Sequence, residues 1–335
     1  MTNAIDTSFT RRVLGVVVLA LAAVLAVVAL PGLSDVRERF AGADTAWLLG
    51  ALLLEVASVT AFVVAFRGVF SRALSWRFSF EVGLSQQAVN VLLPAGGAGG
   101  LALGAWALRR RGMGGEQIAR RSVAFWLITS SANFFAVIVI GALVLTGVLG
   151  SSASHWYAAV PAALALVVIA VVLALPRVLP AAGTGKVARA AAAVSGGVDD
   201  ARRLLPRGGL AVAGGAVGYM AFDIATLAAA FAAFGTTPAA GDLVLAYLLG
   251  QLGGLVPLPG GIGGTDGGLV AALVLFGTPL TAALTAVLAY RVFQLGVPVV
   301  AGAPAFVALR RGLRGEAEPE LEPVRMPVAP VLRSC

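Results

Sequence analysis

Cysteine and histidine are almost absent from this chain. Of its 335 residues, one is a cysteine and one is a histidine. Cys335 is the last residue, and a single thiol excludes an internal disulfide and a thiolate metal cluster. His155 has no second histidine to join it, so neither a histidine-based metal site nor a Ser–His–Asp triad is expected. We therefore expect no metal ion and no cofactor, and our main expectation is a protein that is not an enzyme and has no catalytic residue.

Charged residues are also scarce. They make up 12% of the chain, whereas 59% of the residues are hydrophobic and the mean hydropathy is +0.94. A soluble fold does not need that much apolar residue, so the solvent of this protein is expected to be the bilayer of the cell membrane. The net charge of +8 comes from arginines in short loops between apolar runs, not from one basic face. Such arginines set membrane topology, and we expect no nucleic-acid partner.

Long apolar runs recur along the chain and predict an all-α, multi-pass membrane protein. Two of these runs are interrupted by proline and glycine, at 78–108 and 243–276. Between the two lies a basic segment, 177–208, that is expected to form a linker helix on the cytoplasmic membrane surface. The tail at 315–335 is rich in proline and glutamate and is expected to be disordered in the cytoplasm. The uninterrupted runs are 13–30, 47–66, 122–149, 157–175, 209–234 and 280–309.

The distribution of arginine predicts where each run begins and ends. Under the positive-inside rule, both termini are cytoplasmic, and each interrupted run must return to the side that it entered from. The sequence therefore predicts two halves of inverted topology, 1–176 and 209–314, each with a re-entrant helical hairpin. The alternative is a pair of kinked helices that pack through small residues.

The two interruptions share a glycine pattern. GGAGG occupies 96–100 and GGIGG occupies 260–264, so their first residues are 164 positions apart. Backbone N–H groups of such turns, followed by the N-terminus of a half-helix, form a binding site for an anion such as phosphate. Thr265 and Asp266 stand where N-capping residues are expected. The alternative is that the glycines only allow the hairpins to pack closely.

A few ionisable residues fall at membrane depth, where they are costly and indicate function. Arg291 is the strongest candidate, and its partner is expected to be Asp223, Asp266 or a substrate phosphate. Glu55 and Asp223 occupy roughly equivalent positions in the two halves. They either carry protons in coupled transport or fill polar gaps between helices.

Two stretches resemble a known family. NVLLPAGGAGGLALGAWALRRRG at 90–112 and PLPGGIGGTDGGLVAALVLFGTPLTAALTAVLAYRVFQLGVPVVAG at 257–302 are similar to the transmembrane region of the lysylphosphatidylglycerol synthase/flippase family. The resemblance covers nearly the whole chain up to about 309 and implies movement of an anionic or isoprenoid-linked lipid between leaflets. The soluble synthase domain of the best-known members has no counterpart here, so we expect no lysyl transfer by this chain.

The resemblance and the glycine pattern together define the candidate substrate site. Family members often place an acid and then an arginine after the first glycine cluster, but here Leu101 and Ala102 follow it, and Asp266 replaces a commoner glutamate. The candidate substrate-binding residues are Asn90, Pro94, Gly96, Gly97, Gly99, Gly100, Pro257, Pro259, Gly260, Gly261, Gly263, Gly264, Thr265, Asp266, Tyr290 and Arg291.

The expected function is translocation of an anionic phospholipid or a polyprenyl-phosphate-linked lipid. Its partners are then the membrane lipid itself and, in one interpretation, a separate lipid-modifying enzyme. The alternatives are a secondary transporter for a small anion and an intramembrane lipid-phosphate enzyme, for which Asp266 and Thr265 are the nearest candidate groups.

Overall fold

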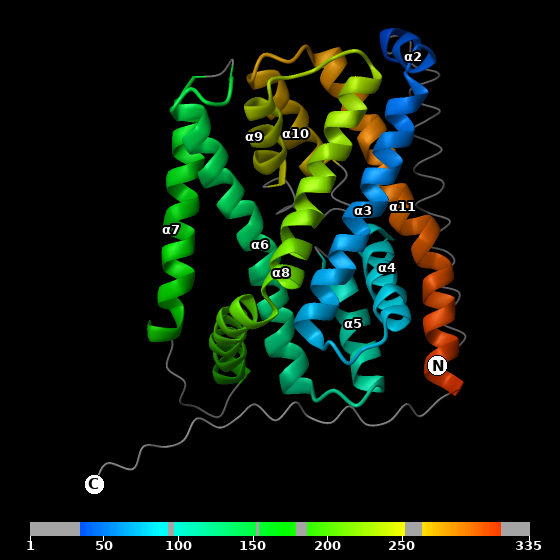
Figure 1. Cartoon of the computed structure of the whole chain (residues 1–335), viewed down its shortest axis with the longest axis vertical. Coiled ribbons are helices and arrows are strands. Elements are labelled where there is room, and N and C mark those ends of the chain that lie inside the picture. The colour runs from blue at the N-terminus through cyan, green and yellow to red at the C-terminus, as the bar shows by residue number, and fades with distance from the viewer. Residues whose placement is uncertain (1–33, 93–96, 152–153, 179–185, 252–262, 316–335) are drawn as a thin grey trace.

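The computed structural model describes all residues except 1–33, 93–96, 152–153, 179–185, 252–262 and 316–335. Every regular element in the described part is an α-helix (Figure 1). The expected first span at 13–30 and most of the expected disordered tail fall outside the described residues. The helices are α2 (Ser34–Ala41), α3 (Thr45–Phe70), α4 (Trp76–Leu92), α5 (Ala98–Arg110), α6 (Gly115–Leu145), α7 (Trp156–Val178), α8 (Lys186–Ala233), α9 (Ala240–Gly250), α10 (Gly264–Leu275) and α11 (Leu280–Gly315).

Five helices of the described part are long and apolar enough to cross a membrane. They correspond to five of the uninterrupted runs of the sequence, so the multi-pass prediction is confirmed for them. Many of their large apolar side chains point outward, among them Leu53, Trp126 and Phe135, which are 69%, 59% and 64% exposed. Such a surface is stable only against lipid. The five segments are Thr45–Phe70, Gly115–Leu145, Trp156–Ala174, Gly209–Ala233 and Leu280–Leu313.

Both interrupted runs are pairs of short helices. α4 ends at Leu92 and α5 begins at Ala98, directly after Gly97, whose φ of 85° is left-handed. α9 ends at Gly250 and α10 begins directly after Gly263, whose φ of 93° is also left-handed. Because only glycine adopts such a φ at no steric cost, both helix breaks follow from the glycine clusters.

The two helix pairs lie at opposite ends of the bundle. In Figure 1, α4 and α5 occupy the lower part and α9 and α10 the upper part, and in each pair the chain turns back toward the end from which it came. The inner ends of α5 and α10 both point toward the middle of the bundle. α11 runs along both levels and packs against α4 as well as α10.

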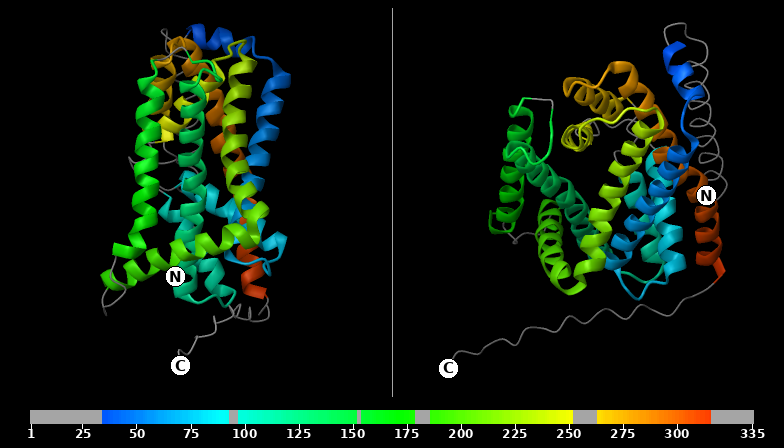
Figure 2. Two further views of the ribbon diagram at one scale, coloured as in Figure 1. Left: turned by 60° about the vertical axis from the view of Figure 1, so that its left-hand side comes forward. Right: turned by 45° about the horizontal axis from the view of Figure 1, so that its top comes forward.

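The described part of the basic linker, from Lys186 on, does not stand apart from the span that follows. This part and the span at 209–233 form one helix, α8, whose first part lies across the lower end of the bundle (Figure 2). This first part is docked on α6, where Arg120 forms an ion pair of 3.0 Å with the buried Asp200. The segment Ser34–Ala41, for which no helix was expected, forms α2 at the upper end.

Close packing of α8 on α3 organises the centre of the molecule. A Cβ built on Gly215 would lie 2.7 Å from the backbone nitrogen of Ala65, so glycine is required for this approach. Small residues at the contact of two helices are the usual means of association in a membrane. This contact lays α3 along the second part of α8, and the two helices carry the buried acids Glu55 and Asp223 there.

Candidate functional site

The N-terminus of α10 is built by Gly263 and Asp266. Gly263 is the N-cap residue, and the carboxylate of Asp266 accepts a hydrogen bond of 3.3 Å from its backbone N–H. Asp266 therefore caps the helix from its third residue. The prediction that Thr265 is an N-cap is wrong, because Thr265 already lies inside the helix and the left-handed Gly263 takes the capping position.

Asp266 also holds Arg291. The two side chains form an ion pair between α10 and α11, with 23% and 10% of their respective surfaces exposed. Of the three partners expected for Arg291, Asp266 is thus the one to which it is bound. A second contact, from Arg291 Nη1 to Gln294 Oε1 at 2.7 Å, orients the guanidinium from its own helix.

Asp223 is buried, and two tyrosines donate hydrogen bonds to its carboxylate. Tyr247 donates a hydrogen bond of 2.5 Å to Asp223 Oδ2, and Tyr290 donates to both carboxylate oxygens at 3.0 Å. All three residues are at most 5% exposed. Since these side chains come from α8, α9 and α11, the carboxylate of Asp223 ties together three helices of the second half.

Glu55 completes this cluster from α3. It is 3% exposed, and one turn away Ser58 of α3 donates a hydrogen bond of 2.9 Å to the carbonyl of Tyr219, which brings this part of α3 against Asp223 on α8. The coupling role expected for Glu55 and Asp223 stays a prediction. The sequence analysis did not identify Tyr247 as a member of this cluster. A tyrosine in an otherwise apolar helix was the available signal, because a buried phenol requires a hydrogen-bond partner.

The first helix pair has a different polar contact. Asn90 Oδ1 accepts a hydrogen bond of 2.8 Å from the backbone N–H of Gly100. In this structure Asn90 thus occupies the N–H of Gly100, and the binding of a phosphate by this N–H stays a prediction. Gly97 and Gly99 remain half-buried near the start of α5. The predicted site residues Pro94, Gly96, Pro257, Pro259, Gly260 and Gly261 fall outside the described residues.

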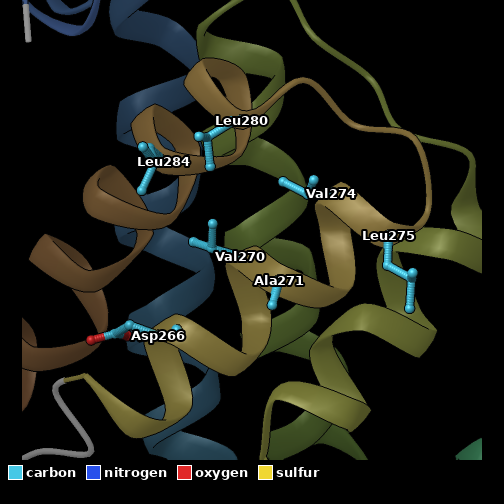
Figure 3. Close-up of a pocket in the computed structure, with 8 residues that line it drawn as sticks. Asp266, Val270, Ala271, Val274, Leu275, Leu280 and Leu284 are labelled. Atoms are coloured by element: carbon cyan, nitrogen blue, oxygen red, sulfur yellow. The ribbon is translucent and has the colours of Figure 1, made fainter. Parts of the chain in front are cut away.

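An apolar groove ends at Asp266, whose carboxylate is paired with Arg291. It has a volume of about 560 Å³ and runs between α10 and α11. Figure 3 shows Asp266 at one end of the groove, with leucine, valine and alanine side chains along the rest. Val274, Leu275 and Leu280 are 40%, 51% and 54% exposed, so the groove opens sideways to the surroundings of the bundle. Its lining is Asp266, Gly267, Val270, Ala271, Val274, Leu275, Leu280 and Leu284.

Comparison with known proteins identifies the family. The model of the family described as "Lysylphosphatidylglycerol synthase TM region" matches residues 12–302. The chain therefore belongs to this family, and the resemblance drawn from 90–112 and 257–302 is confirmed. No curated protein matches the chain. Membership indicates a role connected with membrane lipids.

Proposed function

We propose that this member of the lysylphosphatidylglycerol synthase transmembrane family moves an anionic phospholipid or a polyprenyl-phosphate-linked lipid between the two leaflets. The observation that carries the proposal is the apolar groove that opens sideways and ends at Asp266, the partner of Arg291. The groove offers apolar surface to a lipid chain, and Arg291, behind Asp266, is the cation for its phosphate.

The two short helix pairs support an alternating mechanism. If the bundle axis follows the membrane normal, α4–α5 and α9–α10 are re-entrant hairpins that enter from opposite faces. This is the arrangement of an inverted repeat, in which the substrate site lies between the halves near the midplane. The arginines at the ends of α5 and α11 would then lie on the cytoplasmic side.

The headgroup site would form when a phosphate competes with Asp266 for Arg291. A guanidinium binds phosphate through two parallel hydrogen bonds, and the first backbone N–H groups of α10 add partial positive charge. A charged group at the centre of a bilayer otherwise costs about 2.5–3.5 kcal/mol. Exchange of one anionic partner for another lets the phosphate cross this depth without leaving Arg291 unpaired.

The lateral opening favours a lipid over a small soluble anion. A site for a water-soluble anion needs no apolar groove, whereas a lipid must keep its chain in contact with apolar surface throughout. An enzymatic role is not proposed, because Asp266, the nearest candidate base, is already committed to Arg291 and to the N–H of Gly263.

Translocation in proteoliposomes tests this function. Labelled phosphatidylglycerol and a labelled polyprenyl phosphate serve as probes, and Arg291→Ala is the test variant. We expect a loss of at least about tenfold in rate, the effect of about 1.4 kcal/mol. Arg77→Ala is the matched control, because Arg77 is 83% exposed and lies at the outer end of α4.

A second pair of variants tests the groove. Val270→Trp fills the groove and should slow both lipids, whereas Val167→Trp on the 58% exposed position of α7 should not. Uptake of a small anion without lipid movement would favour the transporter alternative. Movement of neither probe by folded wild-type protein would contradict the proposed function.

A further inference from the structure

Two buried carboxyl groups from different helices meet at the centre of the molecule. Glu55 on α3 and Asp223 on α8 are 3% and 5% exposed. One turn away from each acid, the hydroxyl of Ser58 on α3 donates a hydrogen bond of 2.9 Å to the backbone carbonyl of Tyr219 on α8, so the two carboxyl groups lie at the same level of the contact between these helices. Two neighbouring carboxylates repel each other in an apolar environment, so the pair favours binding of one proton.

The surrounding hydrogen bonds indicate which group is protonated. Asp223 accepts from the hydroxyls of Tyr247 and Tyr290, which stabilise it as the anion. Glu55 then holds the proton of the pair. Its Oε2 atom is buried and has no hydrogen-bond partner among the described residues.

The charges that face this pair are few. Three tyrosines surround the pair: Tyr219, Tyr247 and Tyr290. Each of them is neutral when protonated. Among the described residues, the cation acting on Asp223 is Arg291, which is paired with Asp266 on α10. With Glu55 protonated, this buried group of one arginine and two aspartates has one net negative charge. Loss of the proton adds a second uncompensated charge, which is costly in an apolar environment.

A lipid phosphate would compete for the same cation. A phosphate bound at Arg291 brings another negative charge beside Asp223, so the bound lipid favours the protonated form of Glu55. We propose that Glu55 and Asp223 form a proton-binding site that couples each crossing of an anionic lipid to the crossing of one proton in the same direction. In the step itself, the O–H bond of Glu55 breaks, the proton passes to water and a carboxylate remains. This inference rests on the proposed lipid translocation.

The steady-state ratio of a labelled lipid in the two leaflets tests the coupling, and this ratio does not depend on the rate of translocation. Phosphatidylglycerol carries one negative charge, so its movement with one proton is electrically neutral. At an imposed difference of one pH unit, wild-type protein should enrich the labelled lipid about tenfold in the leaflet on the alkaline side, since one pH unit is a tenfold ratio of proton activity. A membrane potential imposed without a pH difference should cause no enrichment.

Glu55→Gln is the test variant, because glutamine keeps a hydrogen-bond donor for Asp223 but cannot release a proton. The lipid should equilibrate in this variant to a ratio near one despite the pH difference. Glu116→Gln, at an exposed position at the start of α6, is the matched control and should retain the tenfold enrichment.

The wild-type protein alone decides the outcome if Glu55→Gln does not fold. Lipid movement by wild type to a ratio near one under the pH difference would overturn the coupling and leave the translocation intact. Enrichment that persists in folded Glu55→Gln would show that another group carries the proton, and would also overturn the proposal. Absence of any lipid movement would overturn both the coupling and the proposed function.

Discussion

The two helix pairs share a backbone plan but differ in chemistry. In both pairs, a left-handed glycine precedes the second helix, and the chain turns back toward its own end of the bundle. At the turn of α4–α5, the side-chain contact is neutral, from Asn90 to the backbone of Gly100. At the turn of α9–α10, it is ionic, from Asp266 to Arg291.

The difference extends into the surroundings of each pair. On α5, the positions where family resemblance suggests an acid and an arginine hold Leu101 and Ala102, and Leu101 is 45% exposed. Around α10, the charged groups continue through Arg291 to Asp223 and Glu55. A shared fold thus does not require a shared role. The first pair holds its shape with neutral groups, while the second concentrates the buried charge on which the proposed function depends.

The largest expected effect comes from breaking the ion pair of the second helix pair. Asp266→Ala leaves the buried guanidinium of Arg291 without its carboxylate, which typically costs about 3–5 kcal/mol. Thermal unfolding in detergent should show a strongly lowered midpoint, and lipid translocation should be lost.

A double variant separates stability from function at this site. Asp266→Ala/Arg291→Met removes both charges, so much of the stability should return, because an apolar replacement of a buried ion pair is often neutral. Translocation should not return, since the cation for the phosphate is gone. Recovery of translocation in the double variant would show that the pair is only structural and would remove the chemical contrast between the helix pairs.

An intermediate effect is expected where the helices of each pair approach most closely. A Cβ on Gly250 would lie 2.9 Å from the Cα of Leu269, which is backbone of α10. A Cβ on Gly104 would instead meet the end of the Gln86 side chain, which can rotate away. Gly250→Ala should therefore cost about 1–3 kcal/mol, and Gly104→Ala should cost less. Unfolding midpoints of the two variants measured side by side check the order, and a larger loss for Gly104→Ala would contradict it.

Much of this architecture follows from the sequence, because apolar length and glycine act locally. The spans and the positions of both helix breaks were predicted from runs of residues and from Gly97 and Gly263, each of which needs only its own neighbourhood. The continuity of α8 was not predicted. Its linker is held by the contact of Asp200 with Arg120, and residues so far apart along the chain carry no periodic signal.

The candidate site was predicted only in part, because its contacts join residues that are far apart along the chain. Arg291 was identified from its depth in an apolar run, but the choice of Asp266 over Asp223 depends on how α10 and α11 pack. Tyr247 was missed because its role depends on a partner from α8. The contact of the Gly100 N–H with Asn90 was not predicted, because Asn90 lies ten residues earlier on another helix.

The smallest effect is expected from the neutral contact of the first helix pair, and it tests the comparison from the other side. Asn90→Ala leaves the buried N–H of Gly100 without its acceptor, which costs about 1–3 kcal/mol at most when water cannot replace it. This hydrogen bond is only partly buried, with Gly97 and Gly99 half-buried beside it, so the loss should fall near the lower limit. Translocation should stay within about threefold of wild type, a change of about 0.6 kcal/mol. If Asn90→Ala instead abolishes translocation in folded protein, the side-chain amide of Asn90 contacts the substrate. Both helix pairs then take part in translocation despite their different chemistry.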